Sequence, residues 1–139
     1  MKRLASALGA VLLTTAVAAA QSYPGDPGSG VQRGIQQLDN SGQVGTVTLL
    51  RRGDRTAIVV ELHGVPAGRT QAARIFRSRA CSPPSTAPAY VLAALHDGVS
   101  RSTVNASEDR LLSGNYSVVV FSSTQAGARP TACGWLYAS

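Results

Sequence analysis

Two histidines and two cysteines are the side chains of this sequence that most readily bind metals or carry redox chemistry. His63 lies two residues after Glu61, and His96 is followed by Asp97, so each imidazole has a carboxylate nearby in the sequence. A redox copper site generally uses three or more imidazole or thiolate ligands. We therefore interpret both histidines as solvated or turn-stabilising side chains, and a weak metal site that uses His63 or His96 stays open as the alternative.

Other catalytic patterns are absent from the sequence. It contains no G-x-S-x-G nucleophile motif, no glycine-rich phosphate loop and no paired-carboxylate signature. The tripeptide at residues 52–54 (RGD) matches an adhesion motif, but Gly and Asp also suit the tight turn of a β-hairpin, which is the interpretation we adopt. The sequence therefore predicts a protein that is not an enzyme and that carries no cofactor.

Residues 1–20 have the composition of an export signal. A positively charged start, Lys2 and Arg3, precedes an apolar run that extends to Val17, and three alanines end the segment. A membrane-spanning helix needs about 20 predominantly apolar residues, and this run is shorter and interrupted by hydroxyl side chains. We expect a cleaved signal peptide, an extracytoplasmic location (periplasmic or secreted) and no membrane span in the mature chain.

The location decides how the two cysteines, Cys81 and Cys133, are interpreted. An oxidising compartment favours a disulfide between them. Such a bridge would stabilise the fold by roughly 4 kcal/mol because it closes a loop of about 52 residues. A reactive or metal-binding thiol is the alternative, but neither cysteine has a neighbouring histidine or a second cysteine at ligand spacing.

Arginine alone supplies the positive charge once the signal is removed. Lys2 and Arg3 leave with the signal, so 11 of the 13 basic residues remain against 7 acidic ones, a net charge of about +4. The abundant Ala and Gly suggest GC-rich coding, which favours arginine codons. Because aromatic residues make up only 5% of the chain, no platform for stacking bases is present, and we expect no nucleic-acid partner.

The composition, 44% hydrophobic and 14% charged over 139 residues, is that of one globular domain. Residues 21–34 are rich in Gly, Pro and Ser, which predicts a flexible arm there and a folded β domain over residues 35–139.

Short alternating segments separated by turns predict the elements of this domain. Residues 45–50 and 56–64, joined by a turn at 52–55, are typical of a β-hairpin. Further strands are expected at 71–78, 90–95, 99–104, 116–122 and 131–137, and one helical turn at 107–112. Seven or eight antiparallel strands without a long helix predict an all-β fold, a sandwich or flattened barrel.

Four short motifs follow one another in a characteristic order. They are residues 41–49 (SGQVGTVTL), 64–68 (GVPAG), 111–116 (LLSGNY) and 132–134 (ACG). In this order they resemble the copper/zinc superoxide dismutase-like family, above all its small secreted bacterial members, which are also compared with chordin-type (CHRD-like) domains. The resemblance spans residues 37–137 and implies an eight-stranded Greek-key β-barrel in which Cys81 and Cys133 form the disulfide.

The copper ligands of the resembled enzymes do not recur at the matching positions. Those enzymes hold copper with imidazoles, two in a His-x-His pair after the GVPAG-like turn and another on a late central strand. The matching positions here hold Arg74, Phe76 and Phe121. Arginine does not lose its proton and phenylalanine has no lone pair, so neither can ligate copper. The resemblance therefore predicts a degenerate site without metal.

The replacements predict what has become of the site. Phe76 and Phe121 are expected to fill the vacated cavity with apolar volume. Arg74 is expected to point outward within a basic rim that attracts an acidic surface polymer or an envelope protein. The rim consists of Arg69, Arg74, Arg77 and Arg79.

Two classes of function follow. The first is an exported, non-catalytic domain that serves as a structural or binding module of the periplasm or cell surface. The second is an antioxidant copper/zinc protein with non-standard ligands. The exposed edges of a sheet are compatible with a homodimer, and Trp135, close to Cys133, is expected to pack in the core.

Overall fold

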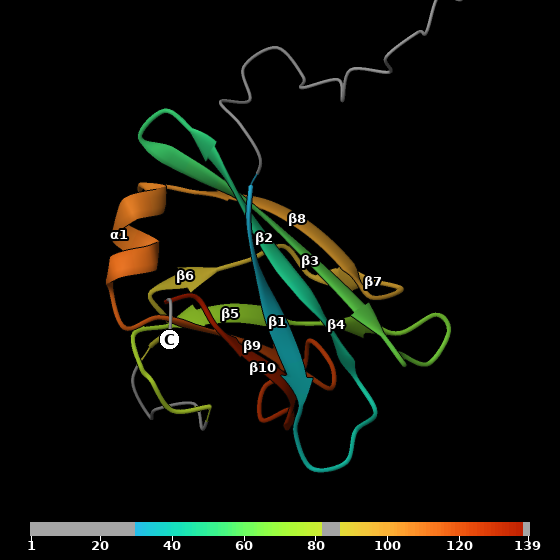
Figure 1. The fold of residues 1–139 in the computed structure, drawn as a ribbon. Helices are drawn as coiled ribbons and strands as arrows, with labels where there is room; N and C mark the ends of the chain where they lie inside the picture. Colours follow the sequence, from blue (N-terminus) through green and yellow to red (C-terminus); the bar gives the residue numbers. More distant parts are fainter. Residues whose placement is uncertain (1–29, 82–86, 138–139) are drawn as a thin grey trace, which may run out of the picture.

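Residues 30–81 and 87–137 are described by the computed structural model. In these ranges the chain forms ten strands and one short helix, α1 (Glu108–Ser113) (Figure 1). The strands are β1 (Val31–Gln37), β2 (Val44–Arg52), β3 (Arg55–His63), β4 (Thr70–Gln71), β5 (Ala73–Phe76), β6 (Tyr90–Val91), β7 (Leu95–His96), β8 (Val99–Val104), β9 (Ser117–Phe121) and β10 (Pro130–Trp135). The expected signal peptide and residues 21–29 of the expected arm lie outside the described residues.

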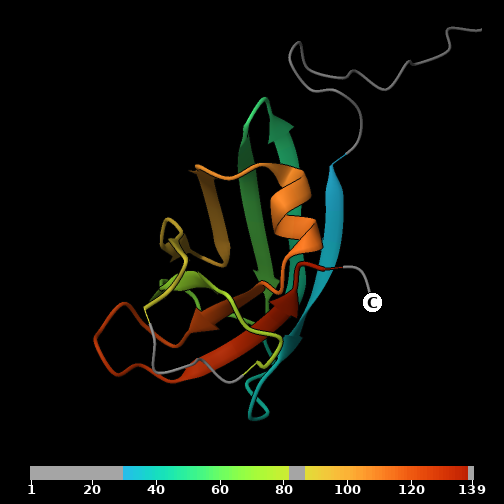
Figure 2. The same cartoon turned by 90° about the vertical axis from the view of Figure 1, so that its left-hand side faces the viewer.

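All paired strands are antiparallel, and they follow one another in the order β4-β7-β8-β3-β2-β1-β10-β9-β5-β6. This continuous sheet folds on itself at β1, which pairs with β2 on one side and with β10 on the other. We call the half from β4 to β1 sheet A and the half from β1 to β6 sheet B. Figure 2 shows the two halves inclined to each other, with β1 running along both.

The two sheets are joined again on the side away from β1. Only Ala72 separates β4 from β5, and residues 92–94 separate β6 from β7, so both segments pass from one sheet to the other. If each of these pairs is counted as one interrupted strand, eight strands form a ring in the order β1, β2, β3, β8, β6/β7, β4/β5, β9, β10. This is a Greek-key flattened barrel, and the predicted all-β fold class is confirmed.

The central hairpin follows directly from the sequence pattern. Strands β2 and β3 pair without a bulge from Val44↔His63 to Arg52↔Arg55. The turn between them uses Gly53 at φ 66°, a left-handed conformation that glycine adopts without a steric penalty. Alternate residues of both strands are buried, which is the period expected of strands with one face on the core.

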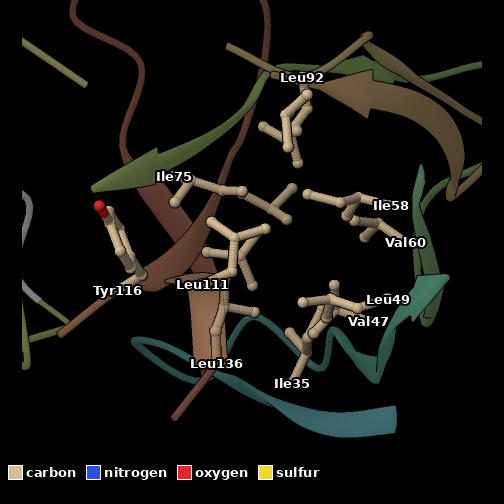
Figure 3. Packing of buried hydrophobic residues seen from close by; sticks show 14 of the residues in the cluster. Ile35, Val47, Leu49, Ile58, Val60, Ile75, Leu92, Leu111, Tyr116 and Leu136 are labelled. Atoms are coloured by element: carbon tan, nitrogen blue, oxygen red, sulfur yellow. The ribbon is translucent and has the colours of Figure 1, made fainter. Parts of the chain in front are cut away.

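The barrel interior is filled by aliphatic side chains from both sheets. Figure 3 shows them meeting, with Ile58 and Val60 of β3 facing Ile75 of β5 and with Leu111 of α1 between the sheets. The completely buried members include Val47, Leu49, Ile58, Val60, Ile75, Leu95, Leu111, Val118, Val120 and Leu136. We refer to this group as the inner core.

Helix α1 closes one end of the barrel. Ser107 caps the helix, because its Oγ accepts a hydrogen bond from the backbone N–H of Arg110 at 3.2 Å. Arg51 at the end of β2 binds the first turn through Asp109, with 3.1 Å between Nη2 and Oδ1. The helix thereby places Leu111 in the inner core, and the predicted helical turn is confirmed.

A buried polar network closes the opposite end, near the start of β2. The Nε2 group of Gln71, which has no exposed surface, donates to Gln43 Oε1 at 2.9 Å and to the carbonyl of Phe121 at 3.0 Å. Thr131 Oγ1 donates to Gln43 Oε1 at 2.7 Å. The network connects the segment before β2 with β4 and β10, so it fixes the ends of three segments that are distant in sequence.

Three expectations about the elements need correction. β1 begins at Val31, so residues 31–34 belong to the sheet and not to the arm. The strand expected at 71–78 ends at Phe76 and is interrupted at Ala72, where the chain changes sheets. The strand expected at 90–95 is divided for the same reason. A continuous strand cannot turn the corner of a flattened barrel without losing part of its ladder.

Candidate functional site

The outer face of sheet B carries the positions that the resemblance matches to the copper ligands of the dismutase-like enzymes. Phe76 on β5 and Phe121 on β9 both lie there, 4% and 7% exposed. Their ring centroids are 6.4 Å apart at an interplanar angle of 63°, an edge-to-face contact. The structure therefore brings these two residues together, and their rings are in direct apolar contact.

Arg74 is the third of the positions that the resemblance matches to copper ligands. It lies opposite Val119 on the neighbouring strand, and its guanidinium carbon is 5.0 Å from the centroid of the Phe121 ring. At this distance the cation is attracted by the face of the ring. A guanidinium and two phenyl rings offer no lone pair to a metal, so the three side chains do not fit a copper ion.

A second small hydrophobic group forms around the phenylalanines, and we call it the outer cluster. Its buried members are Phe76, Val119, Phe121 and Cys133, and Leu38, Ala72, Cys81 and Ala128 pack against them. The disulfide Cys81–Cys133 crosses the cluster, with 5.7 Å between the two Cα atoms, and the predicted disulfide is confirmed. The bridge attaches the segment after β5 to β10.

Ser117 lies on the same face of β9, two residues before Val119. The residue has no exposed surface, and its Oγ has no hydrogen-bond partner among the described residues. A buried hydroxyl in this state costs stability. No sequence signal pointed to this buried hydroxyl, because the covering segments cannot be placed from the pattern of β9 alone.

The two histidines lie on sheet A and are both exposed. His63 ends β3 opposite Val44, whereas His96 on β7 has its Nδ1 atom 3.4 Å from Thr70 Oγ1. Among the residues that the structure describes, no three His, Cys, Asp or Glu side chains gather at a spacing that would hold a metal ion. Within residues 30–81 and 87–137, neither imidazole belongs to a group of three possible metal ligands.

Three of the four arginines of the expected basic rim cover three different aromatic rings. Arg74 lies over Phe121 at 5.0 Å, Arg77 over Tyr116 at 5.7 Å and Arg79 over Tyr137 at 5.0 Å. Arg69 precedes β4, where its carbonyl accepts a hydrogen bond from the backbone N–H of Asp97. The four arginines are thus dispersed, because only Arg74 lies over a ring of the outer cluster.

A groove that sequence reasoning missed lies along β1 and the end of β10. Its volume is about 430 Å³, and it is lined by Arg33, Gly34, Gln36, Trp135 and Tyr137. Trp135 is 37% exposed, so the expectation that it packs in the core was wrong. The alternation along β10 places it outward with Cys133, and only Cys133 is covered by the outer cluster.

Comparisons with known protein families, with curated proteins and with solved structures found no match to this chain. Across residues 30–81 and 87–137, no helix has both the length and the apolar character that a bilayer crossing requires.

Proposed function

We propose that this protein is an exported, non-catalytic domain with a superoxide dismutase-like scaffold. In this proposal its copper/zinc site has been replaced by hydrophobic packing, and the domain serves as a structural or binding module of the periplasm or cell surface. The Greek-key ring of eight strands and the Cys81–Cys133 disulfide support the scaffold. The disulfide also supports an oxidising compartment, and the sequence of residues 1–20 supports export.

The observation that carries the proposal is the packing of Phe76 on Phe121 beneath Arg74. Ligand positions that had only lost their imidazoles would leave a cavity, which costs stability. Here two large rings occupy the place and are shielded by a disulfide and by Leu38. The outer cluster thus stabilises the domain without an ion.

The proposal is tested by metal content. The mature protein, purified without a tag, is incubated with Cu²⁺ and Zn²⁺, desalted and analysed by mass spectrometry, and superoxide dismutation is then assayed. We expect substoichiometric metal and no activity. A His63→Ala/His96→Ala variant treated in the same way is the control. Stoichiometric copper with turnover in the wild type would overturn the proposal in favour of an antioxidant metalloprotein, and loss of copper in the variant would assign the ligands.

The relation to the copper enzymes has its own test. An Arg74→His/Phe76→His/Phe121→His variant restores imidazoles at the three positions. If these positions correspond to a former copper site, the variant binds about one equivalent of Cu²⁺, seen by electron paramagnetic resonance. A folded variant, checked by circular dichroism, that binds no copper would contradict the correspondence.

Export is tested by cell fractionation and by the mass of the secreted chain. We expect the protein outside the cytoplasm, with its N-terminus at Gln21 or within a few residues of it. A full-length chain that is retained in the cytoplasm would contradict this part of the proposal.

A further inference from the structure

The groove between β1 and β10 lies beside the part of β1 that does not pair with β10. Their register is Gln36↔Cys133 and Gln37↔Ala132, and Arg33 and Gly34 lie beyond these pairs. A Cβ atom added at Gly34 would meet no atom within 4 Å, and the φ angle there lies outside the left-handed region. Glycine therefore leaves open a space next to the strand that a Cβ atom could enter.

One wall of the groove is an aromatic ring held in a fixed orientation. The indole Nε1 of Trp135 donates a hydrogen bond to the carbonyl of Arg79 at 2.6 Å, while 37% of the residue stays exposed. Tyr137, the second aromatic residue of the lining, is covered by the Arg79 guanidinium at 5.0 Å. An aromatic surface ordered before binding loses little conformational entropy when a ligand stacks on it.

The charge at the groove is positive and uncompensated. Arg33 donates from Nε to the carbonyl of Leu136 at 3.3 Å and from Nη1 to that of Gln32 at 3.4 Å, so its Nη2 has no hydrogen-bond partner among the described residues. No carboxylate lines the groove. Neither Arg33 nor Arg79 forms an ion pair within the described chain. The Nη2 group of Arg33 can therefore donate a charge-assisted hydrogen bond to a carboxylate.

An aromatic platform, an amide and an arginine together fit an acidic sugar. The C–H face of a pyranose ring stacks on an aromatic surface, its hydroxyl groups bond to a side-chain amide such as that of Gln36, and a uronic acid carboxylate pairs with a guanidinium. The groove volume of about 430 Å³ lies within the roughly 300–1,000 Å³ of small-molecule sites. A nucleic acid would instead need a basic track with several aromatic rings.

We propose that the groove lined by Arg33, Gly34, Gln36, Trp135 and Tyr137 binds uronic acid residues of an acidic polysaccharide. This inference rests on the proposed function, a non-catalytic module of the envelope, and gives that module a class of ligand. Trp135 stacks on the sugar ring, and Arg33 holds the carboxylate.

Trp135 is the only tryptophan of the chain, so its fluorescence reports on the groove directly. The mature protein is titrated with two uronic acid probes of different linkage, tetragalacturonate and a hyaluronan tetrasaccharide. The fully methyl-esterified tetragalacturonate has the same rings without charge, and polyacrylate has the charge without rings. We expect a saturable change in emission with at least one uronic acid probe, and affinities at least about tenfold weaker for the ester and for polyacrylate.

Two variants locate the binding, which is measured by calorimetry. Gly34→Val fills the open space with a residue that suits a strand, and we expect at least a tenfold loss of affinity with an unchanged melting temperature. Arg33→Gln should lower the affinity for the acidic probe by about tenfold and should lower the affinity for the methyl ester much less. Arg55→Gln, which removes an exposed charge at the far end of the β2–β3 hairpin, is the matched control and should bind like the wild type.

The inference is overturned if neither uronic acid probe binds saturably, if polyacrylate binds as tightly as the acidic sugars, or if a folded Gly34→Val variant keeps full affinity. None of these outcomes depends on metal content or on superoxide dismutation. Failure of the sugar site and failure of the metal-free scaffold are therefore seen in separate measurements.

Discussion

The inner core and the outer cluster share strand β9 but are closed by different parts of the chain. Val118 and Val120 point into the inner core, where they meet side chains from other strands and from α1. Val119 and Phe121 point outward and are buried by Leu38, Ala128 and Cys81, which lie outside the strands, and by Cys133 of β10. Every residue of β9 is consequently buried.

The difference shows which part of the fold the strand pattern determines. Alternation alone creates the inner core, because every strand contributes the same face. The outer cluster exists only because separate loop segments are held against sheet B. We therefore expect the free energy of unfolding to depend on side-chain volume in the inner core. In the outer cluster we expect it to depend on the Cys81–Cys133 disulfide.

Removal of the disulfide should have the largest effect. We expect Cys81→Ala/Cys133→Ala to lower the free energy of unfolding by about 4 kcal/mol, because the denatured chain regains the freedom of a long loop. The measurement is urea denaturation of the oxidised wild type and of the variant. When this change is combined with Phe76→Leu, the loss of unfolding free energy should be smaller than the sum of the two separate losses, since both changes affect the outer cluster. Full additivity would show that the cluster is not a cooperative unit.

Truncation of a side chain in the inner core should cause the second largest loss of stability. Ile58→Ala removes a completely buried side chain and should cost about 3 kcal/mol, from lost burial and from the cavity that remains. Val59→Ala, one residue further along β3 and facing outward, is the matched control and should cost less than about 1 kcal/mol. Equal losses in the two variants would contradict the assignment of faces.

Removal of the buried hydroxyl of Ser117 should increase the stability of the fold. Ser117→Ala removes an unpaired polar atom and should raise the free energy of unfolding by about 1 kcal/mol. Ser100 is the matched control, since its Oγ donates to the carbonyl of Ala93 at 2.6 Å, and Ser100→Ala should lower stability by about the same amount. If both variants are destabilised, Ser117 Oγ has a partner in the folded protein.

The smallest effect is expected at Arg74. Arg74→Gln removes the cation from the Phe121 ring and should cost about 0.5 kcal/mol. A double-mutant cycle with Phe121→Leu isolates the pairwise contribution. A coupling energy of zero would mean that Arg74 only covers the ring with its aliphatic part.

The sequence predicted those elements whose information is local. The hairpin of β2 and β3, the helical turn after Ser107 and the strand β9 each follow from alternation, a cap or a turn residue within a few positions. The division of the strands at Ala72 and at residues 92–94 could not be predicted in this way, because it depends on the corner between two sheets. The same limit explains the start of β1, since Val31 joins the ladder through Leu49.

The candidate sites divide in the same manner. Phe76 and Phe121 were singled out from the order of motifs, and the structure places them in contact. The groove was missed because its lining comes from residues 33–36 and 135–137, two short segments that are far apart in the sequence. An exposed tryptophan and a glycine without a neighbour carry no sequence signature of their own.

The position of β10 between β1 and β9 also sets an order of events during biosynthesis. This strand follows all the others along the chain, yet two of them need it as a partner, and it carries Cys133. A nascent chain that lacks residues 130–135 can neither close the ring nor form its covalent bridge, because non-local pairing waits for both partners. The domain thus stays incompletely folded until β10 has emerged from the ribosome.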